Sequence, residues 1–239
     1  MRNLFIVVAA LLCVTPAFAV QHVCYSWEDG GTVLCTYGSN LVGVANVCGP
    51  QNGVYGTGSA SPGGSTAFVC PGACEGNCYL HVAEDPHTGT PSVVIAWIKG
   101  LQIGDTIWAN VCLYDPFEGN STFPGQRIYG AYTSCTDPCV YEAAATNPST
   151  YTNGNPASWN SGTAATSWTW TYQDATEPTG CFRVEVRQYS TPPTANPQHT
   201  DFFIDYVCVE VPDYCEVIFP QGQSPVESST GGVIKALYR

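Results

Sequence analysis

Positively charged side chains are scarce in this chain. Its 239 residues include 7 Lys plus Arg against 19 Asp plus Glu, which gives a formal net charge of -12. Nucleic-acid binding relies on Lys and Arg contacts to phosphates, so the composition argues against a nucleic-acid partner. There is one Met and little Leu, Lys or Arg, so long amphipathic helices are not expected. Beyond the N-terminal segment, no apolar run is a candidate for crossing a bilayer.

The abundant residues are those of strands and turns. Thr, Val, Tyr and Trp favour strands, and the 24 Gly and 18 Pro favour tight turns. Short apolar or alternating segments separated by turn residues predict a sandwich or a barrel of many short strands. We expect these strands at 66–70, 78–83, 92–98, 106–114, 126–133, 167–172, 183–189 and 202–211, with a long polar surface loop over 146–166.

The first nineteen residues have the pattern of a secretory signal peptide. Arg2 supplies the positive start, Leu4–Val14 is an apolar run too short to span a bilayer, and Ala17–Ala19 is an A-x-A cleavage site. We therefore predict a signal peptide at 1–19, a β-sandwich domain at 20–212 and a C-terminal tail at 213–239. The protein is expected to be secreted, whether extracellular, periplasmic or on the cell surface.

Cysteine usage agrees with export. Cys13 falls in the predicted signal, and the remaining twelve cysteines are an even number, which argues for disulfides. A metal site is the weaker alternative, because the C-x-x-x-C-x-x-x-C spacing of Cys70, Cys74 and Cys78 does not match zinc C-x-x-C pairs. Alternation and turn position predict three pairs with Cα separations under about 7 Å: Cys112 with Cys181, Cys70 with Cys78, and Cys135 with Cys139.

Strand alternation assigns the expected inner and outer faces. The inner faces are apolar and should carry Ile107, Ala109, Val111, Leu113, Phe182, Val184, Val186, Val207, Val209 and Val211. The outer faces mix aromatic rings with hydrogen-bonding side chains, whereas a plain solvated face would normally carry Lys, Glu and Thr. This mixture indicates a surface that binds something. Trp168 and Trp170 share one face of their strand and are expected to pack in the core or at an edge.

An ordered series of short motifs resembles a known family. The series runs Tyr25–Leu34, Glu84–Pro86, Gly89–Pro91, Ala96–Leu101, Gly104–Thr106, Arg127–Tyr132, Ser167–Trp170, Val184–Ser190 and Ile204–Tyr206. It resembles the jelly-roll β-sandwiches of carbohydrate-binding modules in secreted bacterial proteins, over about residues 25–211. The resemblance implies an all-β fold, a jelly-roll β-sandwich of two antiparallel sheets. The many cysteines depart from the family, whose members commonly have few or none.

A sugar-binding surface needs flat aromatic platforms beside planar polar groups. The outer-face residues that suit this role are Trp108, Tyr114, Tyr129, Arg183, Glu185, Arg187 and Tyr189. The same residue types are enriched at protein interfaces, so a protein contact is the alternative interpretation.

The family resemblance also implies a structural calcium ion. Its ligands would come from an acid near the first strand and an Asp at the start of the last strand, places that Glu28 and Asp205 occupy. Calcium takes six to eight oxygen ligands, and a cation would satisfy the Asp205 carboxylate, which alternation places on the apolar side.

Catalytic motifs are missing from the sequence. It contains neither a G-x-S-x-G elbow nor an H-E-x-x-H pair. We therefore expect a secreted, non-catalytic module that binds a polysaccharide or glycan. The alternative is a disulfide-hardened structural or cell-surface protein that binds another protein or itself.

Overall fold

The computed structural model describes residues 19–38, 41–48, 54–55, 68–69, 72–84, 90–115, 125–152, 158–173, 180–189, 202–220 and 226–227. The predicted signal peptide, apart from Ala19, lies outside the described residues. Among those residues, no helix is long and apolar enough to cross a membrane.

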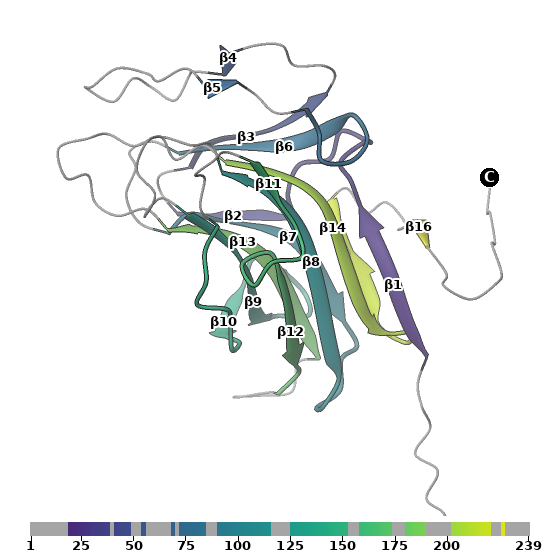
Figure 1. The fold of residues 1–239 in the computed structure, drawn as a ribbon. Helices are drawn as coiled ribbons and strands as arrows, with labels where there is room; N and C mark the ends of the chain where they lie inside the picture. The colour runs from purple at the N-terminus through teal and green to yellow at the C-terminus, as the bar shows by residue number, and fades with distance from the viewer. Residues whose placement is uncertain are drawn as a thin grey trace, which may run out of the picture.

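Two antiparallel sheets make up the body of the protein (Figure 1). Sheet A has the order β11-β8-β14-β1-β16, with β12 also paired to β8, β6 paired to β14, and β3 paired to β6. Its strands are β1 (Val20–Tyr25), β3 (Leu41–Cys48), β6 (Cys78–Glu84), β8 (Thr106–Asp115), β11 (Ser158–Asn160), β12 (Ser167–Thr171), β14 (Phe202–Pro212) and β16 (Val226–Glu227).

Sheet B has the order β10-β9-β13-β7-β15, with β2 paired to β7. Its strands are β2 (Cys35–Tyr37), β7 (Ser92–Lys99), β9 (Gly125–Thr133), β10 (Tyr141–Ala144), β13 (Cys181–Tyr189) and β15 (Glu216–Ile218). A separate two-stranded pair joins β4 (Val54–Tyr55) to β5 (Phe68–Val69).

The chain alternates between the two sheets, which is how a jelly roll is built. From β7 to β9 it passes from sheet B to sheet A and back, and it does so again from β13 through β14 to β15. All eight predicted strand segments contain a strand, and the predicted jelly-roll sandwich is confirmed. The segment expected to be a long loop at 146–166 contains the short strand β11.

The inner faces of the two sheets form the core. All the side chains that alternation placed there are buried in one apolar cluster, and Trp170 belongs to it. Trp168 packs against the same cluster, so the packing interpretation of the tryptophan pair is confirmed. Burial of this apolar surface is the main stabilising contribution to the fold.

The predicted face of Asp205 is wrong because of a β-bulge. The register of β14 with β8 shifts between Asp205 and Val207, and Tyr206 adopts a positive φ of 48°. A bulge inserts one extra residue and moves the alternation by one position. Asp205 consequently pairs with Cys112 on the outer face of sheet A, while Val207 still faces the core.

Part of the sandwich lies beyond Pro212, the predicted end of the domain. Beyond it, β15 pairs with β7, and Phe219 is fully buried in the core. The sandwich therefore continues to at least Phe219. The turn between β14 and β15 is short, and the chain returns at once to the edge of sheet B.

Five disulfides link described residues. None of them is one of the three predicted pairs. Cys112 lies in sheet A and Cys181 in sheet B, so the two do not bond to each other. Cys112 bonds to Cys74, and Cys181 bonds to Cys135. Cys78 bonds to Cys48, its direct partner across β3 and β6, while Cys70 lies outside the described residues. Cys139 bonds to Cys35 of β2, so it does not pair locally with Cys135. The fifth bridge joins Cys24 to Cys208.

Cys215 carries a thiol and forms no disulfide. It is buried in the core, and burial raises its pKa to about 12. The even number of cysteines argued for disulfides, and Cys215 is a free thiol among them.

Candidate ligand-binding face

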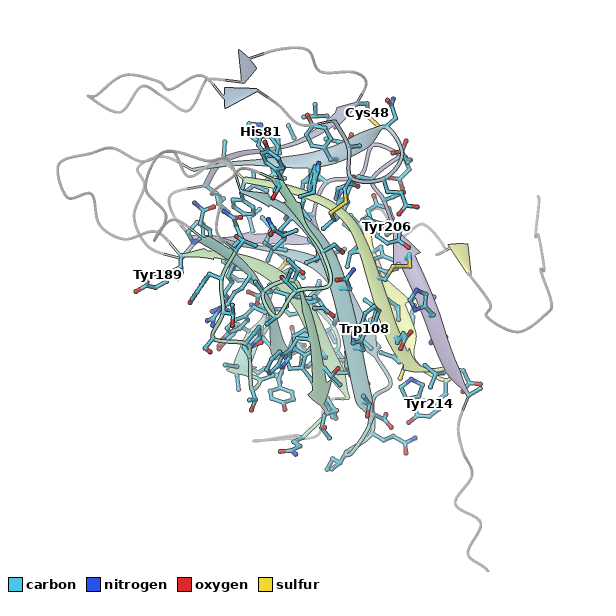
Figure 2. The ribbon with its side chains drawn as sticks, in the orientation of Figure 1. Cys48, His81, Trp108, Tyr189, Tyr206 and Tyr214 are labelled. Carbon is cyan, nitrogen blue, oxygen red and sulfur yellow. A yellow bond between two sulfur atoms is a disulfide. The ribbon has the colours of Figure 1, made fainter. Side chains whose placement is uncertain are left out.

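The seven predicted binding residues fall on two different faces of the sandwich. Trp108 and Tyr114 lie on β8 of sheet A, whereas Tyr129 on β9 and the four residues of β13 lie in sheet B. Figure 2 labels Trp108 beside β8 and Tyr189 at the left edge of the molecule. For these seven residues alternation separated outer from inner positions, but it could not tell one outer face from the other. The seven residues therefore do not form one groove.

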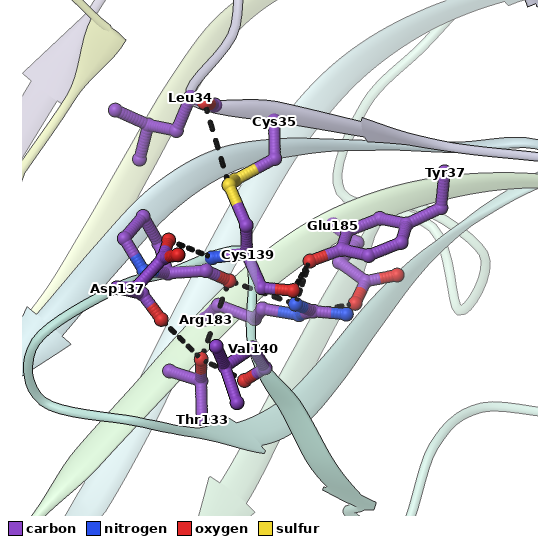
Figure 3. Close-up of a disulfide and its surroundings, with 10 residues drawn as sticks. Leu34, Cys35, Tyr37, Thr133, Asp137, Cys139, Val140, Arg183 and Glu185 are labelled. Carbon is purple, nitrogen blue, oxygen red and sulfur yellow. Dashed lines mark hydrogen bonds and ion pairs between the residues drawn. A yellow bond between two sulfur atoms is a disulfide. The ribbon is translucent and has the colours of Figure 1, made fainter.

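The outer face of sheet B has a covered end, which Figure 3 shows. Arg183 and Glu185 are 1% and 0% exposed and form an ion pair, with Arg183 Nε 2.6 Å from Glu185 Oε1. The Arg183 guanidinium also donates to the Pro138 carbonyl at 2.7 Å and to the Tyr37 hydroxyl. Buried ion pairs need such additional hydrogen bonds to offset their desolvation. These two side chains are therefore structural and are not available to a ligand.

Two disulfides hold the cover in place. Cys35–Cys139 ties the segment 134–140 to β2, and Cys135–Cys181 ties the same segment to β13. Tyr37 donates to the Cys139 carbonyl, and its ring lies 4.3 Å from the Arg183 guanidinium. The extra cysteines of this chain thus close one end of the face that carries most of the predicted binding residues.

The other end of the same face carries alternating rings and guanidinium groups, and the segment 134–140 does not reach it. We call Arg127, Tyr129, Tyr151, Arg187 and Tyr189 the tyrosine–arginine strip. Arg187 lies 3.4 Å from the Tyr129 ring centroid, and Arg127 lies 4.7 Å from that of Tyr151. The rings of Tyr151 and Tyr189 are 5.5 Å apart. Tyr189 is 39% exposed and neither arginine is fully buried, so a ligand can reach these side chains, whereas Tyr129 is only 7% exposed.

The arginines of the strip differ in how they are paired. Arg187 Nε is 2.8 Å from Glu185 Oε2. Burial lowers the pKa of Arg187, but the hydrogen bond to Glu185 and the charge of that carboxylate raise it, and the net pKa is raised. Arg127 donates to the Pro148 carbonyl, but no carboxylate among the described residues forms an ion pair with it. Its Nε is buried without a hydrogen-bond partner. Arg127 therefore presents a positive charge that nothing in the described structure neutralises.

Tyr129 remains neutral at physiological pH. Burial and a hydrogen bond with Tyr141 raise the pKa of Tyr129 to about 12. Tyr141 is itself 43% exposed and its ring centroid lies 5.8 Å from the Arg187 guanidinium. Phenol rings beside guanidinium groups provide both a stacking surface and hydrogen-bond donors.

The positive charge of the described chain is concentrated on this face. The Lys and Arg residues in the described ranges are Lys99, Arg127, Arg183 and Arg187. Lys99 lies over the Trp97 ring at 3.9 Å, and Trp97 pairs with Arg183 across the two strands, so all four side chains share the outer face of sheet B. In a chain of net charge -12, such a distribution is a strong local contrast.

The outer face of sheet A offers a different environment. Tyr114 packs with Trp159 and Phe203 in a small satellite cluster, so it is a packing residue. Trp108 is partly buried and lies 5.9 Å from the His22 ring in a stacked arrangement. Two of the predicted platform residues thus have neighbours that account for their positions.

The predicted calcium ligands are brought to one loop. Backbone N–H groups of Asn77 and Cys78 donate to Glu28 Oε1 at 2.7 and 2.8 Å, and Glu75 N–H donates to Asp205 Oδ2 at 2.8 Å. Asp205 Oδ1 is buried and has no hydrogen-bond partner. Burial, with a smaller repulsion from Glu28, raises the pKa of Asp205 to about 6 despite the backbone hydrogen bonds. A cation between these carboxylates would satisfy the unpartnered oxygen, so the residues fit calcium, which remains a proposal.

Sequence reasoning missed Arg127, Tyr141 and Tyr151. Arg127 was detectable, because it alternates with Tyr129 on the same strand. Tyr151 gave no such signal, since it lies outside any strand, in the segment after β10 that returns over the sheet.

Comparison with known proteins gives limited information. No protein-family model matches the chain, and no curated protein matches it. Among solved structures, one match is a carbohydrate-binding module of the β-sandwich superfamily studied for promiscuous specificity, with 15% identity and a TM-score of 0.41. The match covers 76% of this chain and 58% of the other, so the chain spans less than two thirds of that length.

A second match is the CBM22-1 xylan-binding domain of Xyn10C from Paenibacillus barcinonensis. It has 8% identity and a TM-score of 0.34, and the match covers 77% of this chain and 96% of the other. Both belong to the class of domain that the sequence motifs resemble. At these TM-scores neither likeness indicates the ligand of this chain. Any inference about the ligand rests on the geometry of the face.

Proposed function

We propose that this protein is a secreted, non-catalytic carbohydrate-binding module whose ligand lies along the tyrosine–arginine strip. The observation that supports it most is the alternation of tyrosine rings with the partly exposed Arg127 and Arg187, ending at the exposed Tyr189, on the outer face of sheet B. A tyrosine ring stacks on the apolar C–H face of a sugar, and guanidinium groups donate to its hydroxyl and carboxylate oxygens. Secretion is supported by the five disulfides, which persist in oxidising compartments.

The charge of the strip favours an acidic glycan over a neutral one. Glu185 lies between Arg183 and Arg187, so the three side chains together carry one net positive charge. Arg127 adds a second charge that no carboxylate of the described chain pairs with. A uronate carboxylate would complete a bidentate contact with a guanidinium, the geometry in which Arg recognises carboxylates best.

The acidic remainder of the chain does not prevent this binding at physiological salt. Charges separated by more than about 8 Å are largely screened at 0.15 M ionic strength. We therefore expect local contacts at the strip to outweigh the overall net charge of -12 under those conditions. At about 0.01 M salt, where screening extends to roughly 30 Å, binding should weaken.

The proposal is tested by calorimetric titration with polygalacturonate, with neutral xylan as the comparison. Arg127→Gln should weaken binding of the acidic polymer by about tenfold, corresponding to about 1.4 kcal/mol. Trp108→Ala is the matched control on the opposite sheet and should leave binding unchanged. Equal binding of both polymers would remove the acidic preference but retain the module. Failure of the folded wild type to bind either polymer would favour the alternative, a surface protein that contacts another protein or itself.

A further inference from the structure

The outer face of sheet A carries a disulfide beside a histidine that the proposed glycan site does not use. Cys24 on β1 and Cys208 on β14 are direct cross-strand partners, with a Cα–Cα distance of 4.1 Å. His22 precedes Cys24 by two residues, so both side chains lie on the same face of β1. Cys24 is half-buried, whereas Cys208 is 3% exposed, so a molecule approaching this face meets the Cys24 sulfur first.

A carboxylate, the imidazole and the disulfide form a continuous line of contacts. His22 Nε2 lies 3.2 Å from Cys24 Sγ, and His22 Nδ1 lies 2.8 Å from Glu210 Oε1. Glu210 is the cross-strand partner of His22, so the sheet register itself fixes this contact. The Trp108 ring stacks against the imidazole, and the Tyr206 hydroxyl donates to Cys24 Sγ at 3.3 Å.

This arrangement has the parts of an activated cysteine. A nucleophilic sulfur is activated by a base within hydrogen-bond reach, and the base is in turn oriented by a third group. Here Cys24 is the sulfur, His22 is the group that gives a proton to the leaving sulfur when the disulfide opens, and Glu210 is the orienting group. The His22 ring nitrogen and both sulfur atoms lie within 4.8 Å of one another, so the imidazole can stabilise a thiolate on either cysteine. The thiolate is the reactive form in thiol–disulfide exchange.

We propose that Cys24–Cys208 is a thiol–disulfide exchange site that reacts with low-molecular-weight or protein thiols, with His22 and Glu210 assisting the sulfur that leaves. An incoming thiolate bonds to Cys24 Sγ, the Cys24–Cys208 bond breaks, and its electron pair goes to Cys208 Sγ, which takes a proton from the His22 imidazolium. A second thiolate attacks the substrate sulfur of the mixed disulfide, and Cys24 leaves as a thiolate beside His22. Two thiols are oxidised to one disulfide, and the protein disulfide is reduced.

The chain supplies an internal control for this proposal. Cys48–Cys78 is also a direct cross-strand bridge with a Cα–Cα distance of 4.1 Å. Its neighbour two residues earlier is Asn46, whose Oδ1 lies 3.1 Å from Cys48 Sγ. Cys48 is exposed and Cys24 is half-buried, so solvent access alone would make Cys48–Cys78 the faster of the two to react.

The experiment measures both reduction rates in one sample. Oxidised, secreted protein is treated with a limiting concentration of reduced glutathione, quenched with iodoacetamide at early times, and mapped by mass spectrometry. The ratio of the two rates cancels the thiolate fraction of glutathione. We expect Cys24–Cys208 to react at least about tenfold faster, because a positioned acid or base typically contributes about 10²-fold or more. A ratio at or below one would overturn the proposal.

Three variants separate a chemical role of the histidine from an effect on folding. His22→Asn recreates the neighbourhood of Cys48 and should bring the ratio close to one, and Glu210→Gln should lower it less. Glu216→Gln, on sheet B beside Lys99, is the control and should leave the ratio unchanged. An unchanged ratio in folded His22→Asn protein would also overturn the proposal.

Discussion

The two cross-strand bridges of sheet A are the same bond in different surroundings. Cys24–Cys208 lies beside a histidine that a glutamate orients, and Cys48–Cys78 lies beside Asn46. The Asn46 amide also donates to the carbonyls of Trp27 and Gly31 at 2.7 and 2.9 Å, so that it fastens the N-terminal loop to β3. The two bridges thus differ in the residue two positions before the first cysteine. His22 contacts the sulfur of Cys24 and a carboxylate, whereas Asn46 holds the N-terminal loop.

The two bridges should differ in how much the free energy of unfolding falls when each is removed. Cys24–Cys208 closes a separation of 184 residues and Cys48–Cys78 one of 30. Chain entropy alone would assign about 5 kcal/mol to the long loop and about 4 kcal/mol to the short one. Other bridges within the long loop shorten it in the unfolded chain, so we expect a difference below about 1.5 kcal/mol. Urea unfolding of Cys24→Ser/Cys208→Ser and Cys48→Ser/Cys78→Ser measures it, and a larger loss from the short bridge would contradict the entropic account.

The loop before Cys78 also contacts a buried carboxylate, Asp205 of β14, whereas the carboxylate beside Cys24, Glu210, is partly exposed. The raised pKa of Asp205, about 6 against an ordinary value of 3.8, means that its contribution to stability is complete below about pH 4 and is lost as the pH rises through 6. With EDTA present, the free energy of unfolding should fall by about 2–3 kcal/mol over this range. Asp205→Asn should flatten the curve.

Calcium gives an independent readout on the same carboxylate. At pH 7.5, added calcium should raise the melting temperature of the wild type and have little effect on Asp205→Asn. A wild-type melting temperature that responds to neither calcium nor EDTA would contradict the calcium proposal. The partners of Glu28 and Asp205 would then be the backbone N–H groups of residues 75, 77 and 78.

The smallest expected effect is at Trp108, whose ring stacks on His22 beside the Cys24–Cys208 bridge. Its ring is partly buried and stacks on His22, so Trp108→Ala should lower stability by about 1 kcal/mol, as measured by thermal unfolding. The reduction rate of Cys48–Cys78 should not change. A loss of about 3–5 kcal/mol would instead mark Trp108 as a core residue.

Local pattern predicted the strands well because hydrophobic alternation is a local property. Ile107, Ala109, Val111 and Leu113 alternate cleanly, and all four face the core. The same reasoning failed at Asp205, since a bulge at Tyr206 changes the alternation without leaving a mark in the sequence. Where a residue breaks the regular ladder, periodicity stops predicting the face.

Assigning a residue to a sheet requires long-range pairing, which a single sequence does not contain. Cys112 and Cys181 both occupy outer positions, yet one lies in sheet A and the other in sheet B, so their predicted bond was impossible. The predicted binding residues failed to form one groove for the same reason. Trp108 and Arg187 have the same local pattern, and only the topology places them on opposite sides.

The pairing of the first strand with a strand near the end of the chain has a consequence for biogenesis. Cys24 emerges early during synthesis, and its partner Cys208 appears 184 residues later. At about 5–20 residues per second, that interval lasts on the order of 10–40 seconds. During it, the Cys24 thiol is exposed to the sulfurs of Cys35 and Cys48, which are much nearer in sequence. We therefore expect that export into a compartment with a disulfide isomerase raises the yield of native protein.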